Sequence, residues 1–76
     1  MNYDVTINKE ADVPTFIDQC NKIKNLGYDG IKQVIDVDGS YINYYNKGDK
    51  SIEVYLDYEI GATYVKSNID LTDIII

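Results

Sequence analysis

Tight turns divide the second half of this 76-residue chain into short segments in which apolar and polar residues alternate. The turns, whose residue types suit hairpins, are predicted at Asp38-Gly39, Asn46-Lys47-Gly48 and Ile60-Gly61. The alternating segments are residues 31–37, 40–46, 52–58 and 63–71. Alternation with a period of two is typical of strands with one buried face, and short turns join antiparallel neighbours. The chain from Ile31 onward therefore predicts a four-stranded antiparallel meander.

The turns also predict a register for this sheet. When the three turns contain two, three and two residues, in chain order, the apolar side chains of all four strands fall on one face. They are Ile35, Val37, Ile42, Ile52, Val54, Leu56, Val65, Ile69 and Leu71. Because a slip of one residue would turn a strand over, this agreement favours the register.

One helix is predicted over about residues 13–26. Asp12 suits an N-cap, Pro14 suits the first turn and Gly27 suits the stop. The apolar residues at helical spacing are Val13, Phe16, Ile17, Cys20 and Ile23. Residues 3–8 alternate and are predicted to add a strand to the same sheet. The predicted fold class is α+β, a single domain of residues 1–76 with one helix packed on a mainly antiparallel sheet of four to five strands, in the order β-α-β-β-β-β.

The second face of the predicted sheet cannot be covered by the same helix. Its predicted residues are Val34, Asp36, Tyr41, Asn43, Tyr45, Glu53, Tyr55, Asp57, Tyr64 and Lys66. One interpretation is a solvated face on which tyrosine satisfies strand propensity. Another is a protein-binding surface with tyrosine anchors and an acidic rim, and a third is a homodimer through this face or a strand edge. The candidate partner-binding residues are Asp36, Tyr41, Tyr45, Glu53, Tyr55, Asp57 and Tyr64.

The charge balance indicates the kind of partner. The chain has a formal net charge of −6, with 13 acidic residues against 7 lysines and no arginine or histidine. Such a chain repels nucleic acid and anionic membranes, so we expect a basic protein partner and no direct binding to either. Carboxylates two residues apart on a strand are about 6.6–6.8 Å apart, broadly like phosphates along a nucleic-acid strand. An acidic sheet can therefore compete for the basic residues that bind phosphates, which gives the hypothesis of DNA mimicry.

Residues for catalysis or metal binding are scarce. One cysteine without histidine excludes an ordinary zinc site. Residues 36–40 resemble the opening of a calcium loop, but Tyr41 and Lys47 stand where that loop requires glycine and glutamate, so a hairpin turn explains the segment better. Cys20 fits the apolar stripe, and a nucleophile there would lack a histidine base. We expect no catalytic residue, no metal and no cofactor, and thus a protein that is not an enzyme.

The ends and the single cysteine bear on location. The start lacks the regions of a signal peptide, no run of roughly 18 apolar residues occurs, and one cysteine excludes an internal disulfide framework. We therefore expect a cytoplasmic protein.

The segment Ile74-Ile75-Ile76 is either a last half-strand packed on the core or a docking tail. Packing is favoured, because an exposed run of three isoleucines invites aggregation.

The composition as a whole resembles that of small, acidic, arginine-poor inhibitors of bacterial defence encoded by phages, such as anti-CRISPR proteins. The resemblance rests on the length, the charge, the bias toward Asn, Ile, Lys, Tyr and Asp, and the acidic stretch of residues 53–59. It implies a stoichiometric blocker of a nucleic-acid-binding effector in the host cytoplasm. Such proteins share no single fold, so no residue role is carried over. The alternatives are a self-associating structural or regulatory module, and an immunity protein or antitoxin.

Overall fold

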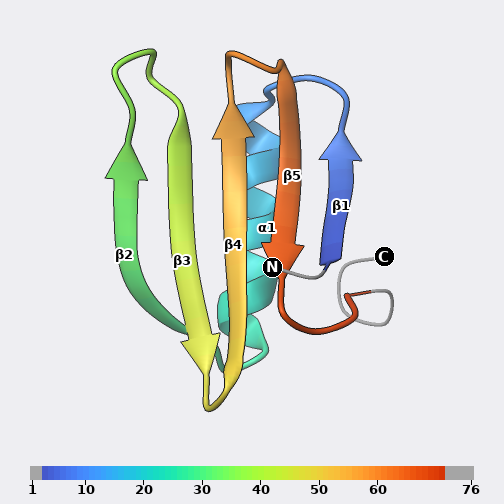
Figure 1. Cartoon of the computed structure of the whole chain (residues 1–76), viewed down its shortest axis with the longest axis vertical. Helices are drawn as coiled ribbons and strands as arrows, with labels where there is room; N and C mark the ends of the chain where they lie inside the picture. Colours follow the sequence, from blue (N-terminus) through green and yellow to red (C-terminus); the bar gives the residue numbers. More distant parts are fainter. Residues whose placement is uncertain (1–2, 72–76) are drawn as a thin grey trace.

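The protein, described here for residues 3–71 by a computed structural model, folds into one sheet with one helix on one of its faces (Figure 1). The elements, in chain order, are β1 (Tyr3–Asn8), α1 (Val13–Asn25), β2 (Asp29–Ile35), β3 (Tyr41–Lys47), β4 (Lys50–Asp57) and β5 (Ala62–Ser67). All strand pairs are antiparallel, and the spatial order is β1-β5-β4-β3-β2. The predicted α+β class and the element order β-α-β-β-β-β are confirmed.

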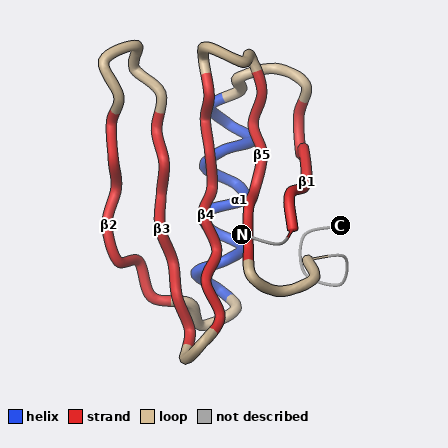
Figure 2. The backbone as a smooth tube through the Cα atoms, in the orientation of Figure 1, coloured by secondary structure: helices blue, strands red, loops and turns tan. Residues whose placement is uncertain are grey.

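The first strand lies in the sheet, as predicted, and forms one of its edges. β1 pairs with β5, so that Asp4 faces Lys66 and Val5 faces Val65. The chain then crosses one face of the sheet as α1 and begins the meander at the opposite edge with β2 (Figure 2).

Helix α1 begins and ends where its flanking residues predict. The Asp12 carboxylate accepts hydrogen bonds from the backbone N–H of Thr15 (3.1 Å) and from the Thr15 hydroxyl (2.5 Å). Pro14 stands in the first turn, where a missing N–H costs nothing. Gly27 follows the C-cap with a φ of 89°, a conformation that favours glycine.

This N-cap makes a first prediction. Asp12→Ala is expected to lower the free energy of unfolding by about 1 kcal/mol, because the N–H of Thr15 loses its acceptor. Urea unfolding followed by circular dichroism measures the loss. Asp18→Ala is the matched control: this exposed aspartate in the middle of α1 has only a surface ion pair with Lys22 (3.5 Å). Equal losses in the two variants would contradict a capping role for Asp12.

The core lies between α1 and the central strands. Ile23, Ile52, Val54 and Val65 are completely buried, and Leu71 is almost so. The other buried members of this cluster are Phe16, Cys20, Tyr28, Tyr45 and Leu56. Val13 and Ile17, which the helical spacing assigns to the apolar stripe, remain 45% and 52% exposed. Only part of the predicted stripe therefore packs on the sheet.

Strand β3 is turned over relative to the predicted register. The β3–β4 turn consists of Gly48 and Asp49 alone, with Lys47 opposite Lys50, whereas the prediction used a three-residue turn that ends at Gly48. Gly48 has a φ of 62°, as two-residue hairpin turns require. The pairing of β3 with β4 shifts by three residues as a result, and an odd shift exchanges the two faces of a strand.

The consequences of this inversion are clear along β3. Tyr41 lies opposite Leu56, and Tyr45 lies opposite Ile52, so both tyrosines point to the helix side. Ile42, predicted on that side, lies opposite Tyr55 on the other face. The predicted placement of Tyr41, Asn43 and Tyr45 on the uncovered face is therefore wrong.

The other two turns differ from the prediction without exchanging a face of β2 or β5. Between β2 and β3, the backbone N–H of Asp36 donates to the Ser40 carbonyl (2.8 Å), which leaves a turn of three residues, 37–39, where the prediction used two. This shift of one residue and the shift of three at the β3–β4 turn together leave Val34 and Ile35 on their predicted sides. Val37 belongs to this loop and is fully exposed. The β4–β5 connection spans residues 58–61, which slides β5 by two residues and keeps its faces. The segment Ile74-Ile75-Ile76 lies outside the described residues.

Candidate protein-binding face

The sheet face that points away from α1 is here called the outer face. The register assigns to it Asp4, Thr6, Lys32, Val34, Ile42, Tyr44, Glu53, Tyr55, Asp57, Tyr64 and Lys66. Four of the candidate partner-binding residues come together there, on the adjacent central strands: Glu53, Tyr55, Asp57 and Tyr64.

The remaining three candidates lie elsewhere. Asp36 follows the end of β2 and lines a shallow depression of about 80 Å³ together with Asp57, at the edge of the outer face. Tyr41 packs edge-on against Phe16, with ring centroids 6.1 Å apart. Tyr45 is 4% exposed, and its burial, followed by the nearby Cys20 thiol, raises its pKa to about 12. Tyr41 and Tyr45 are thus part of the helix side of the protein.

A stacked tyrosine pair forms the centre of the outer face. Tyr55 and Tyr64 lie directly opposite each other on β4 and β5, with ring centroids 4.6 Å apart and ring planes 10° apart. Directly opposed side chains are the closest neighbours that an antiparallel pair offers, and aromatic pairs at this distance stabilise one another. The two rings are held in one arrangement by strands that are themselves packed on the core.

Each hydroxyl of the pair donates a hydrogen bond to a carboxylate on β4. The Tyr55 hydroxyl donates to Glu53 Oε1 (2.5 Å), and the Tyr64 hydroxyl donates to Asp57 Oδ2 (2.8 Å). Burial is the main reason that the pKa of both tyrosines is well above its usual value, and the neighbouring carboxylates add to the shift. The phenols therefore stay neutral, while the carboxylates carry the charge.

Two lysines lie over aromatic rings of the outer face. Lys66 Nζ is 5.2 Å from the Tyr55 centroid and 5.7 Å from that of Tyr64, and Lys32 Nζ is 4.6 Å from the ring of Tyr44. Lys66 also lies opposite Glu53 in the register. The outer face thus combines three carboxylates with two ammonium groups and is not a uniform row of acids.

A stronger excess of negative charge lies at one end of the sheet. The β1–α1, β2–β3 and β4–β5 connections gather at the upper end in Figure 1. Near them the sequence places one cation, Lys9, and six carboxylates, those of Glu10, Asp12, Asp36, Asp38, Asp57 and Glu59. Hydrogen bonds from Ser40 lower the pKa of Asp38, which keeps that exposed carboxylate ionised. This group is here called the acidic end, and Asp57 joins it to the outer face.

The sequence prediction missed five outer-face residues. Ile42 and Tyr44 are absent from it because β3 was inverted, and Asp4, Thr6 and Lys32 were not assigned to that face. A two-residue turn at Gly48-Asp49, tested against the alternation of β4, is the signal that would have recovered Ile42 and Tyr44.

Within residues 3–71, no three His, Cys, Asp or Glu side chains are grouped in a way that could hold a metal ion. The helix of this part of the chain is too short and too polar to cross a membrane. Comparisons of the chain with protein-family models, with curated proteins and with solved structures find no match.

Proposed function

We propose that this protein is a stoichiometric binding inhibitor that presents an acidic, tyrosine-bearing surface to a basic partner. The proposed partner is a nucleic-acid-binding effector of bacterial defence, which the protein would block in the bacterial cytoplasm in the manner of a phage anti-CRISPR protein. The support for this function is the Tyr55–Tyr64 stack, which is held between the charged Glu53 and Asp57 on the outer face.

The stack has the properties of an interface anchor. Tyrosine is enriched where proteins bind one another, because it offers a large apolar ring with a polar tip. Here the stacking fixes the rings, and the carboxylates fix the hydroxyls of Tyr55 and Tyr64. A side chain that is already ordered loses little entropy on association, so a preorganised pair favours affinity.

The carboxylates supply the preference for a basic partner. Glu53 and Asp57 are four positions apart on β4, which corresponds to about 13 Å along the strand. This is twice the spacing of about 6.6–6.8 Å on which the hypothesis of phosphate mimicry rests. The acidic end extends this charge beyond the sheet and increases the rate of encounter with a basic protein. Lys66, which lies opposite Glu53 in the register and over the ring of Tyr55, offsets part of this negative charge.

Charge reversal tests the proposed surface. The double variant Glu53→Lys with Asp57→Lys is expected to bind the partner about tenfold or more weakly, since attraction becomes repulsion at two positions. The partner is first captured from bacterial lysate on the immobilised protein, identified, purified and then titrated by calorimetry at low and high salt. Asp49→Lys is the matched control, because this exposed aspartate lies in the β3–β4 turn, at the opposite end of the sheet from the acidic end (Figure 1).

The result expected is a nucleic-acid-binding partner whose affinity falls with salt, falls in the double variant and stays unchanged in Asp49→Lys. Nucleic acid added in excess should also displace the inhibitor from that partner. An affinity that survives both reversals would rule out the outer face as the interface. A captured partner that binds no nucleic acid would rule out the proposed mimicry.

A further inference from the structure

Strand β2 is an edge of the sheet, and one side of its backbone pairs with no other strand of residues 3–71. A helix is about 10 Å wide and strands are about 4.8 Å apart, so α1 covers about two strands. It lies over β4 and β5 and leaves all seven residues of β2 exposed (Figure 1). Such an edge offers a row of free backbone N–H and C=O groups to a further strand.

The regular part of this edge consists of residues 32–36 and is centred on Val34. A bulge at Ile31 interrupts the pairing with β3 before this stretch, and the turn of residues 37–39 follows it. If a second β2 pairs antiparallel with the first, a two-fold axis through Val34 therefore uses the whole regular stretch of both strands.

The backbone groups that point outward suit this axis. The N–H of Asp36 points toward β3, where it donates to the Ser40 carbonyl (2.8 Å). Because backbone groups alternate in direction along an antiparallel strand, those of Val34 also point toward β3, whereas those of Gln33 and Ile35 point away from it. With Val34 on the axis, Gln33 of each copy lies opposite Ile35 of the other. Each of these pairs can exchange both of its backbone hydrogen bonds.

The outer-face side chains of the edge match the same axis in charge. Lys32 precedes Val34 by two positions and Asp36 follows it by two, so the axis sets Lys32 of each copy directly opposite Asp36 of the other. Such pairs lie between the hydrogen-bonded ones, where Cα atoms are about 4.5 Å apart and side chains are closest. Opposite charges in this position stabilise a sheet. The edge is therefore self-complementary, which favours a second β2 over an unrelated strand.

We propose that β2 pairs antiparallel with β2 of a second copy of the chain, about a two-fold axis through Val34. The pairing joins two five-stranded sheets into one. Because the axis is perpendicular to the sheet, the outer faces of both copies lie on the same side and remain uncovered. A dimer of this kind presents two Tyr55–Tyr64 stacks on one surface and goes beyond the function proposed for a single copy.

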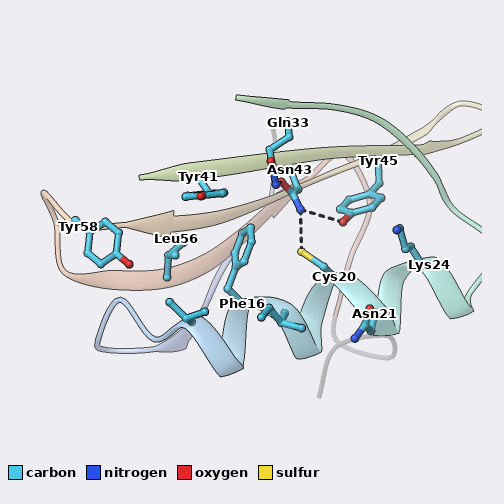
Figure 3. A pocket seen from close by; sticks show the side chains of 12 residues that line it. Phe16, Cys20, Asn21, Lys24, Gln33, Tyr41, Asn43, Tyr45, Leu56 and Tyr58 are labelled. Atoms are coloured by element: carbon cyan, nitrogen blue, oxygen red, sulfur yellow. Dashed lines mark hydrogen bonds between the residues drawn. The ribbon is translucent and has the colours of Figure 1, made fainter. Parts of the chain in front are cut away.

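The helix side of the edge gains apolar contact. Ile35 is 58% exposed, and the pairing places it against Gln33 of the second copy. The Gln33 side chain lies over β3, where its Nε2 donates to Asn43 Oδ1 at 2.7 Å (Figure 3). Its amide nitrogen already has an acceptor within its own chain, so contact with Ile35 covers apolar surface without breaking that bond.

The net charge of −6 on each copy opposes association, but the antiparallel arrangement keeps the two acidic ends apart. The two β2 strands run in opposite directions, so the acidic end of each copy lies beside the start of β2 in the other. Lys24, in the last turn of α1, lines a depression there together with Gly30. The register sets Asp38 of the second copy opposite Gly30 and thus brings this carboxylate toward a lysine.

Sedimentation velocity tests the pairing at concentrations up to about 1 mM, since a contact this small is expected to be weak. The parent should dimerise. Lys32→Asp and Asp36→Lys should each weaken association about tenfold or more, because each sets like charges opposite one another at two positions. The double variant Lys32→Asp with Asp36→Lys exchanges the two charges and should restore the dimer.

The controls separate the pairing from the overall charge. Asp36→Lys changes the net charge from −6 to −4, so repulsion between whole molecules falls although the dimer is expected to weaken. Lys50→Asp makes the same change of charge as Lys32→Asp at an exposed lysine on β4, which β3 separates from the edge. It should associate as the parent does.

Disulfide formation locates the axis. Val34→Cys should cross-link two copies, because Cα atoms about 4.5 Å apart are within the range of a disulfide. Val37→Cys is the control: Val37 is fully exposed, but the two copies of this residue would be about 20 Å apart along the strands. The buried Cys20 is native to both variants, and free thiols are blocked before gel electrophoresis.

Three outcomes would overturn this proposal. The first is a parent that stays monomeric at about 1 mM, which would leave the edge to a strand of another protein. The second is a charge-exchanged double variant that is folded by circular dichroism and does not associate, and the third is cross-linking of Val37→Cys as readily as Val34→Cys. Because Glu53 and Asp57 lie on β4, away from this edge, failure here leaves the charge-reversal test of the proposed function unaffected.

Discussion

Replacing Ile23 by alanine is expected to lower the free energy of unfolding by about 2–5 kcal/mol. Ile23 is completely buried on the packed side of α1, in the last turn of the helix, so the change removes three carbon atoms from the core and leaves a cavity there. A domain of this size has a total stability of roughly 4–11 kcal/mol. The loss is therefore a large share of the whole, and urea unfolding at neutral pH measures it directly.

The matched control for this variant is on the same helix. Ile17→Ala removes the same atoms six residues earlier, where the side chain is 52% exposed, and we expect it to cost well under half as much. Both variants change the helix propensity equally, so the difference reports packing alone. Similar losses in both would mean that α1 contacts the sheet through a different side from the one described.

Raising the pH above about 10 is expected to destabilise the fold steeply. The pKa values of Tyr55 and Tyr64 are raised well above 10, mainly by burial, and that of Tyr45 is raised to about 12. Unfolded tyrosine loses its proton near pH 10, so above that pH the folded state holds protons that the unfolded state has released. The stability linked to these groups is fully present below pH 10 and is lost as the pH rises toward their folded pKa values.

The experiment measures the urea midpoint from neutral pH to about pH 12, together with tyrosinate absorbance. The double variant Tyr55→Phe with Tyr64→Phe should lose less of its stability across this range than the parent, because its stack can no longer ionise. Tyr58→Phe is the control, since Tyr58 is an exposed ring outside the stack. If the double variant declines as steeply as the parent does, the stack is not linked to the alkaline transition.

The helix, the number of strands and their order could be predicted because each depends on local pattern. Alternation in β4 is clear: Ile52, Val54 and Leu56 are buried, and the polar or aromatic residues between them lie outward. Asp12, Pro14 and Gly27 mark the helix through the backbone groups that each satisfies or lacks. Glu53 and Asp57 were assigned to the correct face for the same local reasons.

The two faces of β3 were exchanged in the prediction because that strand has no polar face. Its sequence, from Tyr41 to Tyr45, places aromatic or aliphatic side chains on both sides, so alternation cannot choose between them. Only the length of the β3–β4 turn decides which side of β3 faces the helix, and Gly48 is compatible with a turn of two residues and with a turn of three. The tyrosine stack was missed because a two-residue β4–β5 turn sets Tyr55 opposite Lys66, whereas the four-residue connection sets it opposite Tyr64.

The groove of about 450 Å³ between α1 and the helix side of β2 and β3 could not be predicted from any local pattern. It depends on which strands α1 lies over, and that position is decided by packing across the whole molecule. Val13 and Ile17 have the spacing of core residues, yet they extend past the covered strands.

The pairing of β1 with β5 sets the order in which the chain can complete its sheet. Val5 and Val65 are sixty positions apart, whereas the meander joins only neighbouring strands. At a synthesis rate of about 5–20 residues per second, β1 waits roughly 3–12 seconds before its partner strand exists. Strand β1 therefore cannot pair until residues 62–67 have been synthesised, and until then the edge that it presents to β5 has no partner.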